Sequence, residues 1–341
     1  MRRLMSGSEY RNRIRVGVIG CGWHSRAAHG PSLKQYKAVH PELQLAACCD
    51  VDEEAVESYR ADFGFERAYT SLEAMLAQEQ LDAVWVLVPE QLTTVVSLKV
   101  MDAGTALLLE KPPGVNTAEV IQLYEHAKLK GIKHRVAFNR RYVPLVRKLM
   151  DKLQEQAAQG KSIYSLTYDM IRVKRTDPDF STTAIHAIDA ARWIAGADYE
   201  SLRFRYDDLS AISEGLMNIA AEGTFRSGIR VQLNCYPHSG IARELVTVRG
   251  EGFTYELHMP LMENAGSFTG LICSERGRIE TIAAAEDWQH AFGFYDENAS
   301  FLDILSAGGT DLLGLEEDLR SSVQSVEIME AIRGRAEAYY G

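Results

Sequence analysis

The sequence predicts two domains: an α/β domain with a doubly wound parallel sheet, followed by an α+β domain with a large, open and mostly antiparallel sheet. Three observations support this prediction. Short apolar β-like segments alternate with helical segments up to about Phe138. After about residue 160, polar and apolar residues alternate within segments that short glycine turns separate. The chain has 341 residues, which is long enough for two hydrophobic cores.

The first half of the chain contains five candidate strands with helical segments between them. Such an alternation is typical of a parallel sheet covered by helices on both faces. Asn116 with Glu119, and Thr70 with Glu73, have the spacing of capping boxes and predict two of the helix starts. We place this domain at residues 13–138 and expect residues 1–12 to form a flexible N-terminus. The candidate strands are 14–19, 43–49, 83–88, 105–109 and 133–138.

The second half is predicted to form an open antiparallel or mixed sheet with helices. Short turns between neighbouring strands indicate antiparallel pairing, with one sheet face packed and the other polar. We place this domain at residues 139–341, and its C-terminal helices are candidates for packing back on the first domain. The polar face is either solvated or in contact with another subunit, and we favour a homodimer or homotetramer formed through this sheet. The candidate strands are 162–173, 229–235, 244–249, 253–258 and 271–282, and the candidate helices are 183–195, 296–307 and 315–333.

Composition and charge exclude several classes of protein. A net charge of −10 argues against a nucleic-acid partner, because phosphate backbones are bound by clustered lysines and arginines. The sequence has no secretion signal and no apolar run near the ~18 residues that span a bilayer, so we predict a cytoplasmic protein without membrane contact. The five cysteines form no Cys-x-x-Cys pair, which favours reduced core thiols and no metal site.

A glycine turn at the end of the first strand predicts a dinucleotide-binding site. Gly20 supplies a tight turn, and Gly22 lets the backbone approach a pyrophosphate at the N-terminus of the next helix. The third position of the motif is Ser25 rather than glycine. Asp50 ends the next strand, where a carboxylate accepts hydrogen bonds from a ribose diol and repels the phosphate of NADP. We therefore predict NAD as the cofactor, with NADP less favoured.

The segment Glu110-Lys111-Pro112-Pro113 places a charged pair at the end of the fifth strand. The carboxyl ends of the strands form the ligand crevice of a doubly wound sheet, so Lys111 is expected to project toward a bound cofactor. Its ammonium group can stabilise a developing alkoxide. The alternative is a surface ion pair between Glu110 and Lys111.

His186 and Asp189 lie three residues apart on a predicted helix and so share one face. A carboxylate one turn away can fix the tautomer of an imidazole and support its protonated form, as a general base requires. The alternative is a helix-surface histidine beside a charged neighbour.

Together these motifs resemble the oxidoreductase family of glucose-fructose oxidoreductase, inositol dehydrogenase and the rhizopine-catabolism protein MocA. The resemblance runs over nearly the whole chain and includes Asn139-Arg140-Arg141-Tyr142. It implies a Rossmann domain, a substrate domain with a large open sheet, and oxidation or reduction of a sugar, polyol or related compound with a nicotinamide cofactor. Such proteins are commonly dimers or tetramers formed through the sheet.

The resemblance also implies roles for individual residues. Lys111 would contact both cofactor and substrate, and His186 would be the catalytic acid or base, with Asp189 as its supporting carboxylate. The cofactor would be held by Gly20, Cys21, Gly22, Trp23 and His24 at the pyrophosphate turn, by Asp50 at the adenosine ribose, and by Val88, Pro89 and Glu110 on the nicotinamide side. The substrate would meet Lys111, Arg141, Tyr142, Thr182 and His186.

One departure from the family pattern leaves alternatives open. The family often has an aspartate four residues before the histidine, where this chain has Thr182. A hydroxyl cannot raise the basicity of His186, so Asp189, Asp177 or Asp179 takes that role, or the chemistry differs. A dinucleotide-binding sensor without catalysis is one rival function, and a methyltransferase is another. The second half also offers polar candidates for a substrate pocket, namely Arg172, Lys174, Asp179, Tyr236 and His238.

Overall fold

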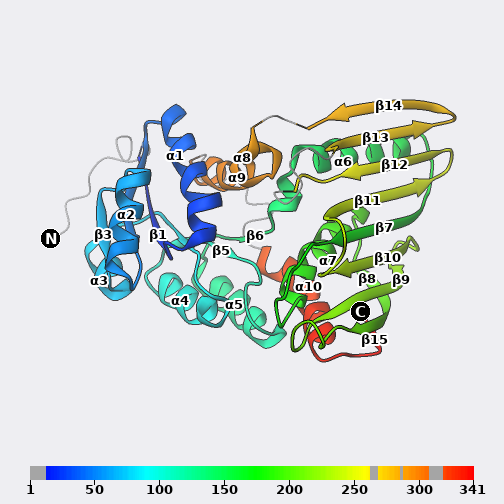
Figure 1. The fold of residues 1–341 in the computed structure, drawn as a ribbon. Coiled ribbons are helices and arrows are strands. Elements are labelled where there is room, and N and C mark those ends of the chain that lie inside the picture. Colours follow the sequence, from blue (N-terminus) through cyan, green and yellow to red (C-terminus); the bar gives the residue numbers. More distant parts are fainter. Residues whose placement is uncertain (1–12, 262–267, 285–286, 307–317) are drawn as a thin grey trace. The chain divides into compact units, whose positions relative to one another are not determined.

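The computed structural model describes residues 13–261, 268–284, 287–306 and 318–341, and it divides into two compact units (Figure 1). The first unit combines the chain up to Ala137 with Phe294–Val323. The second combines Phe138–Gly293 with Gln324–Gly341. The expected flexible segment, residues 1–12, lies outside the described residues.

The first unit contains a six-stranded parallel sheet in the order β3-β2-β1-β4-β5-β6. The order reverses between β1 and β4, and this switch point is where a doubly wound sheet binds its ligand. Five of the strands were predicted to within two residues at each end. The short edge strand β3 was not predicted. The bounds are β1 Ile14–Ile19, β2 Leu43–Cys49, β3 Arg67–Tyr69, β4 Ala83–Val86, β5 Ala106–Glu110 and β6 His134–Ala137.

Helices cover both faces of this sheet. The pair α4 and α5 packs together on one face, and α1 packs with α9 on the other (Figure 1). Asn116 caps α5 as predicted, with its side chain accepting from the Glu119 N–H, whereas the cap of α3 is Ser71 and not Thr70. The bounds are α1 Gly30–Val39, α2 Glu53–Phe63, α3 Leu72–Gln78, α4 Glu90–Asp102, α5 Thr117–Lys130 and α9 Phe294–Ser306.

The helix that follows the glycine turn begins irregularly. Ser25–His29 forms a π-helical turn, labelled η2, directly before α1. Such turns hold one more residue than an α-helical turn and are frequent at functional sites. His24 and His29 lie at the two ends of this turn.

The core of the first unit draws on two distant parts of the chain. Val18 and Trp85 from the central strands pack with Phe301 and Leu302 from α9. The rings of Trp85 and Phe301 meet edge to face, with centroids 5.5 Å apart. A segment near the C-terminus is therefore part of the α/β unit.

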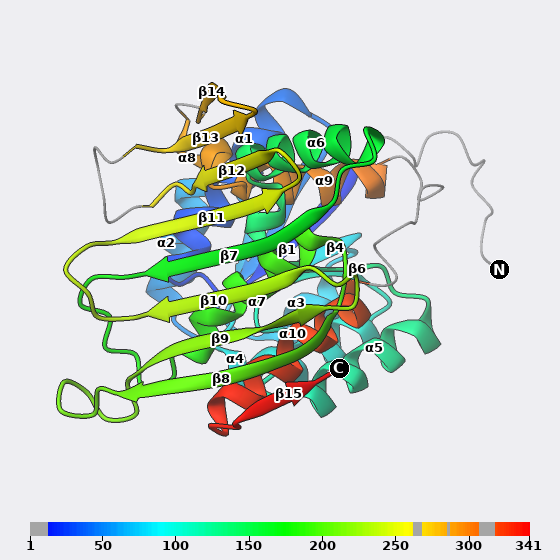
Figure 2. The same ribbon diagram turned by 90° about the vertical axis from the view of Figure 1, so that its right-hand side faces the viewer.

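The second unit contains a nine-stranded sheet in the order β14-β13-β12-β11-β7-β10-β9-β8-β15 (Figure 2). Only β7 and β10 pair in parallel, so the sheet is mixed and mostly antiparallel as predicted. The predicted strand at 271–282 is two strands joined by a turn at Gly277, and β8, β9 and β15 were not predicted. The bounds are β7 Ile163–Ile171, β8 Tyr199–Asp208, β9 Met217–Phe225, β10 Arg230–Tyr236, β11 Arg243–Gly250, β12 Phe253–His258, β13 Gly270–Glu275, β14 Arg278–Ala283 and β15 Ala338–Tyr340.

One face of this sheet is covered by helices of the same unit. α6 packs on β12 and β13, and α7 packs on β7 and β10, which buries an apolar core (Figure 2). Both fold classes predicted from the sequence are confirmed. The bounds are η3 Asn139–Tyr142, α6 Pro144–Ala158, α7 Ser181–Ala195, α8 Trp288–Ala291 and α10 Asp318–Arg333; residues 307 and 315–317 of the predicted helices lie outside the described residues.

Among the helices that the structure describes, none combines the length and the low polarity of a membrane span.

Candidate functional site

The glycine turn lies at the switch point of the parallel sheet. Gly20 has φ +94°, and a Cβ atom there would lie 2.2 Å from the Leu87 carbonyl oxygen, so only glycine fits. The same Cβ would lie 3.4 Å from the Val88 nitrogen, which places Val88, followed by Pro89, beside the turn. At Gly22 a Cβ would meet no protein atom within 4 Å. Protein packing therefore does not require glycine at this position, and the open space suits a bound group that approaches the backbone.

Asp50 follows β2 and holds the turn in place. Its Oδ2 accepts from the Cys21 N–H at 2.7 Å, and its Oδ1 accepts from the Asp52 N–H at 3.1 Å. Each carboxylate oxygen can accept a second hydrogen bond. The residue can therefore shape the turn and still receive ribose hydroxyls, so the geometry fits a dinucleotide.

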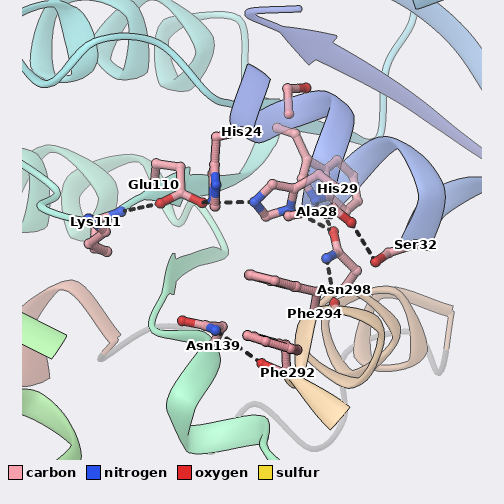
Figure 3. A network of polar contacts seen from close by, with 12 residues as sticks. His24, Ala28, His29, Ser32, Glu110, Lys111, Asn139, Phe292, Phe294 and Asn298 are labelled. Carbon is pink, nitrogen blue, oxygen red and sulfur yellow. Dashed lines mark hydrogen bonds and ion pairs between the residues drawn. The ribbon is translucent and has the colours of Figure 1, made fainter. Parts of the chain in front are cut away.

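Glu110, at the end of β5, joins two histidines from the π-helical turn (Figure 3). The His24 Nε2 lies 2.9 Å from its Oε1, and the His29 Nε2 lies 2.8 Å from the same oxygen. The Lys111 N–H donates to the other oxygen at 3.1 Å. The sequence interpretation placed His24 at the pyrophosphate turn and did not foresee that its ring reaches Glu110.

A second layer of hydrogen bonds orients His29 (Figure 3). Its Nδ1 lies 3.1 Å from the Oδ1 of Asn298, on α9. That oxygen also accepts from the Trp85 indole N–H at 2.6 Å, while the Asn298 Nδ2 donates to the Phe294 carbonyl at 2.7 Å. Sequence reasoning missed His29 and Asn298, which are 269 residues apart. The only signal in the sequence was the histidine pair itself.

Burial and charge act in opposite directions on this cluster. Burial raises the pKa of Glu110, but the charge of His24 and hydrogen bonds from both histidines outweigh it and hold the pKa well below its ordinary value of 4.5. The charge of Glu110 in turn raises the pKa of His24 above 6.5, although burial lowers it. Glu110 is thus an anion that two imidazoles share.

Lys111 follows directly, and its peptide bond to Pro112 is cis. The sequence left open whether Glu110 forms a surface ion pair with Lys111. In the structure, the Glu110 carboxylate is mostly buried and faces the two histidines. Glu110 thus contacts both imidazoles, and the contact of Lys111 with a ligand stays a prediction.

The candidate general base lies in the second unit. His186 is partly exposed on α7, which packs on β7 and β10. Thr182, one turn earlier, donates its hydroxyl to the Asp179 carbonyl at 3.1 Å. Tyr142 is half-buried at the end of η3, with the Arg147 guanidinium 5.3 Å from the centre of its ring. Thr182 and Tyr142 remain candidates for substrate contact.

Asp189 has a different partner from the one expected. The Arg141 Nε and Nη2 donate to its Oδ2 and Oδ1 at 2.8 and 2.5 Å, and the Ser325 hydroxyl donates to Oδ1 at 3.3 Å. Both Arg141 and Asp189 are buried. A buried two-pronged pair is a structural link, and the expected roles of Asp189 beside His186 and of Arg141 toward a substrate stay predictions.

The two other aspartates considered as partners of His186 are also engaged. Asp177 accepts from Arg175 at 2.7 Å, and Asp179 accepts from Arg333 at 2.6 Å. Another candidate pocket residue, Arg172, binds Glu244 in a buried network. The polar side chains that the sequence offered for a substrate pocket thus include several that hold the second unit together.

Comparisons with known proteins agree with the fold. Residues 14–138 match the family model described as "Oxidoreductase family, NAD-binding Rossmann fold". A curated relative, the myo-inositol 2-dehydrogenase of Thermotoga maritima, is 26% identical over 55% of this chain and 57% of its own length. The match thus spans less than two thirds of that protein.

Solved structures extend the likeness to the second unit. A dehydrogenase from Chromobacterium violaceum superposes with a TM-score of 0.81 at 19% identity and covers 95% of both chains. The WlbA dehydrogenase from Bordetella pertussis, solved with NADH and UDP-GlcNAcA, gives 0.76 at 20% identity, with 96% of this chain and 99% of that one covered. With the glycine turn, Asp50 and Lys111 in place, residues 14–138 match the Gfo/Idh/MocA oxidoreductase family, and the first unit has the NAD-binding Rossmann fold of that family.

Proposed function

We propose that this protein is an NAD(P)-dependent dehydrogenase or reductase that acts on a CH–OH group of a sugar, a polyol such as an inositol, or a sugar derivative. The observation that carries the proposal is the position of Lys111 at the end of β5, in a sheet whose switch point carries the glycine turn. Relatives that act on inositol support the substrate class. Which sugar or polyol is used, and in which direction, is a question for a substrate panel.

The residues of the first unit would hold the cofactor. Gly20, Gly22 and the backbone between them would receive the pyrophosphate, and Asp50 would accept the ribose hydroxyls. Val88, Pro89 and Glu110 would line the nicotinamide side. When bound, the nicotinamide supplies the redox chemistry that the protein's own side chains lack.

Lys111 and His186 are the proposed catalytic residues. The ammonium group of Lys111 hydrogen-bonds the substrate oxygen and stabilises the negative charge that develops on it. The imidazole of His186 accepts the hydroxyl proton during oxidation and returns a proton during reduction. The protein thus positions the reacting groups and supplies the charge that stabilises the developing negative charge on the substrate oxygen.

Alanine variants test these assignments. Lys111→Ala and His186→Ala should each lower kcat by at least about 100-fold, since a positioned proton-transfer or charge-stabilising group contributes about that much. Turnover is followed by cofactor absorbance on a panel of inositols, aldoses, sugar acids and amino sugars. Lys148→Ala, a change at an exposed lysine on α6, serves as the control. Turnover near the wild-type rate in both variants would remove the assignment.

We also propose that NAD is preferred over NADP. The Asp50 carboxylate ends β2 and would repel a phosphate on the adenosine ribose. Fluorescence titration should give a lower Kd for NAD than for NADP, and Asp50→Asn, which keeps the size of the side chain and removes its negative charge, should narrow the difference. Equal affinities in the wild type would contradict the proposal.

A homodimer or homotetramer formed through the second sheet is the proposed assembly, in the cytoplasm. A hollow of about 610 Å³ lies on this sheet, and none of the predicted site residues lines it. Its lining includes charged and hydroxyl side chains, which can pair with a second copy across an isologous interface. Light scattering measures the mass, and a monomer at micromolar concentration would exclude this assembly. The lining includes Ser165, Thr167, Arg203, Glu222, Thr224 and Arg230.

One observation favours a second candidate function, a cofactor-binding sensor without catalysis. Asp177, Asp179 and Asp189, the carboxylates considered as partners of His186, are each bound to an arginine. Thr182 replaces the aspartate that the family often has. Tight NAD binding without turnover on the whole panel would identify the sensor, whereas turnover with any member excludes it.

A further inference from the structure

His24, His29 and Glu110 bring three ligand atoms to one place in the first unit (Figure 3). The two imidazole nitrogens and one carboxylate oxygen all lie within 4.8 Å of one another. The His29 side chain is fully buried, that of Glu110 is 14% exposed, and that of His24 is 43% exposed. Two imidazoles with one carboxylate form the donor set of many zinc and iron sites, and here the set is accessible from one side.

Two neighbouring groups fix the orientation of the Asn298 amide, because one can only donate a hydrogen bond and the other can only accept one. The Trp85 indole N–H can only donate, and it lies 2.6 Å from Oδ1. The Phe294 carbonyl can only accept, and Nδ2 donates to it at 2.7 Å. The amide oxygen therefore faces His29, and the His29 Nδ1, 3.1 Å away, must carry a proton.

This assignment determines what the other nitrogen of His29 presents. In a neutral imidazole with a proton on Nδ1, Nε2 carries no proton and presents a lone pair. That lone pair points at the Glu110 Oε1, 2.8 Å away, and the His24 Nε2 approaches the same oxygen at 2.9 Å. Two lone pairs at hydrogen-bond distance repel one another unless a cation lies with them. The cation is either an extra proton or a metal ion.

The surroundings of His29 and Glu110 are those of metal ligands. A ligating histidine usually donates its second ring N–H to a carbonyl or carboxylate, which fixes the ring and its tautomer. His29 does so to the Asn298 amide oxygen, and Asn298 is itself buried. The second oxygen of Glu110 accepts from the Lys111 N–H. Both ligands are thus oriented by buried or backbone partners.

We propose that His24, His29 and Glu110 bind a first-row divalent metal ion, with Zn²⁺ as the best match to two imidazoles and one carboxylate. Bonds of about 2.0–2.1 Å in a tetrahedral site place ligand atoms roughly 3.3 Å apart. The present separations of 2.8 and 2.9 Å suit a shared proton. The ion takes the place of this proton, which passes to solvent, and the donors move apart by about half an ångström. Three protein ligands leave a fourth position for water or a substrate oxygen.

Metal titration of the whole chain tests the site. The protein is prepared without a polyhistidine tag, stripped with a chelator, and titrated with Zn²⁺ in competition with a chromogenic chelator. We expect one tight equivalent, and Co²⁺ in its place should give the visible absorption of a four- or five-coordinate site. His24→Ala and Glu110→Gln should each weaken binding by at least 100-fold. Asn298→Ala should weaken it by about 10–100-fold, as the loss of an orienting partner does.

His40→Ala is the matched control. The His40 ring, like that of His24, is partly exposed, at 38%, and lies 3.2 Å from a carboxylate, that of Glu42. This variant should keep the tight equivalent. Because His24 is exposed, its alanine variant leaves the core intact, and far-UV circular dichroism verifies the fold.

Two results would overturn the proposal: a wild-type protein that binds less than one equivalent, or an affinity for Zn²⁺ that His24→Ala leaves unchanged. The titration uses neither NAD nor substrate, so its outcome is separate from that of the proposed dehydrogenase activity.

Discussion

Two buried glutamates, one in each unit, illustrate how the choice of partner decides what a carboxylate can do. Glu110 faces two imidazoles, whereas Glu244, on β11, faces two guanidinium groups and a phenol. The Arg140 Nε and Nη2 donate to Glu244 at 2.6 and 3.1 Å, Arg172 donates to Oε2, and the Tyr168 hydroxyl donates to Oε1 at 2.6 Å.

The charges around Glu244 are permanent. Burial raises the pKa of Glu244, but Arg140 and Arg172 outweigh it and hold the pKa far below 4.5. Arginine does not lose its proton in the physiological range, so this network is a fixed structural link. Imidazoles can exchange a proton for a metal ion or another proton. We therefore expect the Glu244 network to stabilise the second unit, and the Glu110 cluster of the first unit to exchange a proton or a metal ion.

The largest effect is expected from Glu244→Gln. The substitution leaves Arg140 and Arg172 buried without their anion, which should lower the free energy of unfolding by about 3–5 kcal/mol. Urea denaturation at pH 7 measures the loss. Glu251→Gln, at an exposed position in the turn between β11 and β12 of the same sheet, is the control and should change stability by less than about 0.5 kcal/mol. A loss below 1 kcal/mol at Glu244 would show that the network does not carry the stability assigned to it.

A smaller effect is expected from Tyr168→Phe. It removes one hydroxyl from Glu244 and leaves both arginines in place, so the loss should be about 2 kcal/mol, the contribution of a hydrogen bond to a charged group. The same denaturation experiment measures it. Tyr164→Phe, at an exposed ring on the same strand, is the control. A cost as large as that of Glu244→Gln would mean that the phenol, and not the ion pairs, holds the network.

The smallest expected effect is a pH dependence of the unfolding free energy that Glu110→Gln removes. Because the folded pKa of His24 is raised above 6.5, the stability from its pairing is present below pH 6.5 and is lost as pH rises through the folded value. In the presence of EDTA, Glu110→Gln should therefore cost more at pH 6 than at pH 9. The difference should stay below about 1 kcal/mol, because solvent screens the exposed His24.

The cost of Glu244→Gln supplies the contrast for this measurement. Its carboxyl pKa is lowered, so its contribution is fully present above pH 4.5 and should be equal at pH 6 and pH 9. Unfolding curves of both variants at the two pH values make the comparison. If Glu110→Gln lowered the unfolding free energy equally at pH 6 and pH 9, the contribution of Glu110 would be independent of pH in this range, like that of Glu244.

The sequence was sufficient for most of the first unit, because a parallel sheet buries whole strands and so produces apolar runs with clear ends. It failed at β8 of the second unit. There the segment Leu202-Arg203-Phe204-Arg205-Tyr206-Asp207-Asp208 alternates, but its outward positions carry so many charges that it resembles a loop. An open sheet face can be strongly polar, and composition alone does not distinguish such a strand from a turn.

The candidate site was predicted in part for a similar reason. Gly20, Asp50 and Lys111 follow strand ends, and a motif of fixed order identifies them. Asn298 comes from a helix near the other end of the chain, and no local pattern links it to His29. The pairing of Asp189 with Arg141 was not predicted, because spacing on one helix indicates only local neighbours and Arg141 comes from another element. Distant pairings of this kind depend on tertiary packing.

The π-helical turn at Ser25–His29 has a consequence for how such a site is inherited. In a regular α-helix, a step of five residues rotates the side chain by about 500°, so two rings five positions apart would diverge by about 140°. The wider turn brings the rings of His24 and His29 to within 5.7 Å. The number of residues in the turn, as well as the identity of the two histidines, therefore determines whether their rings come close together. Four steps of a regular α-helix rotate the side chain by about 400°, so an α-helix would also bring two rings together if four positions separated them. A lineage that straightens the turn without deleting a residue would therefore lose the cluster, whereas one that also deletes an alanine would keep both rings on one face.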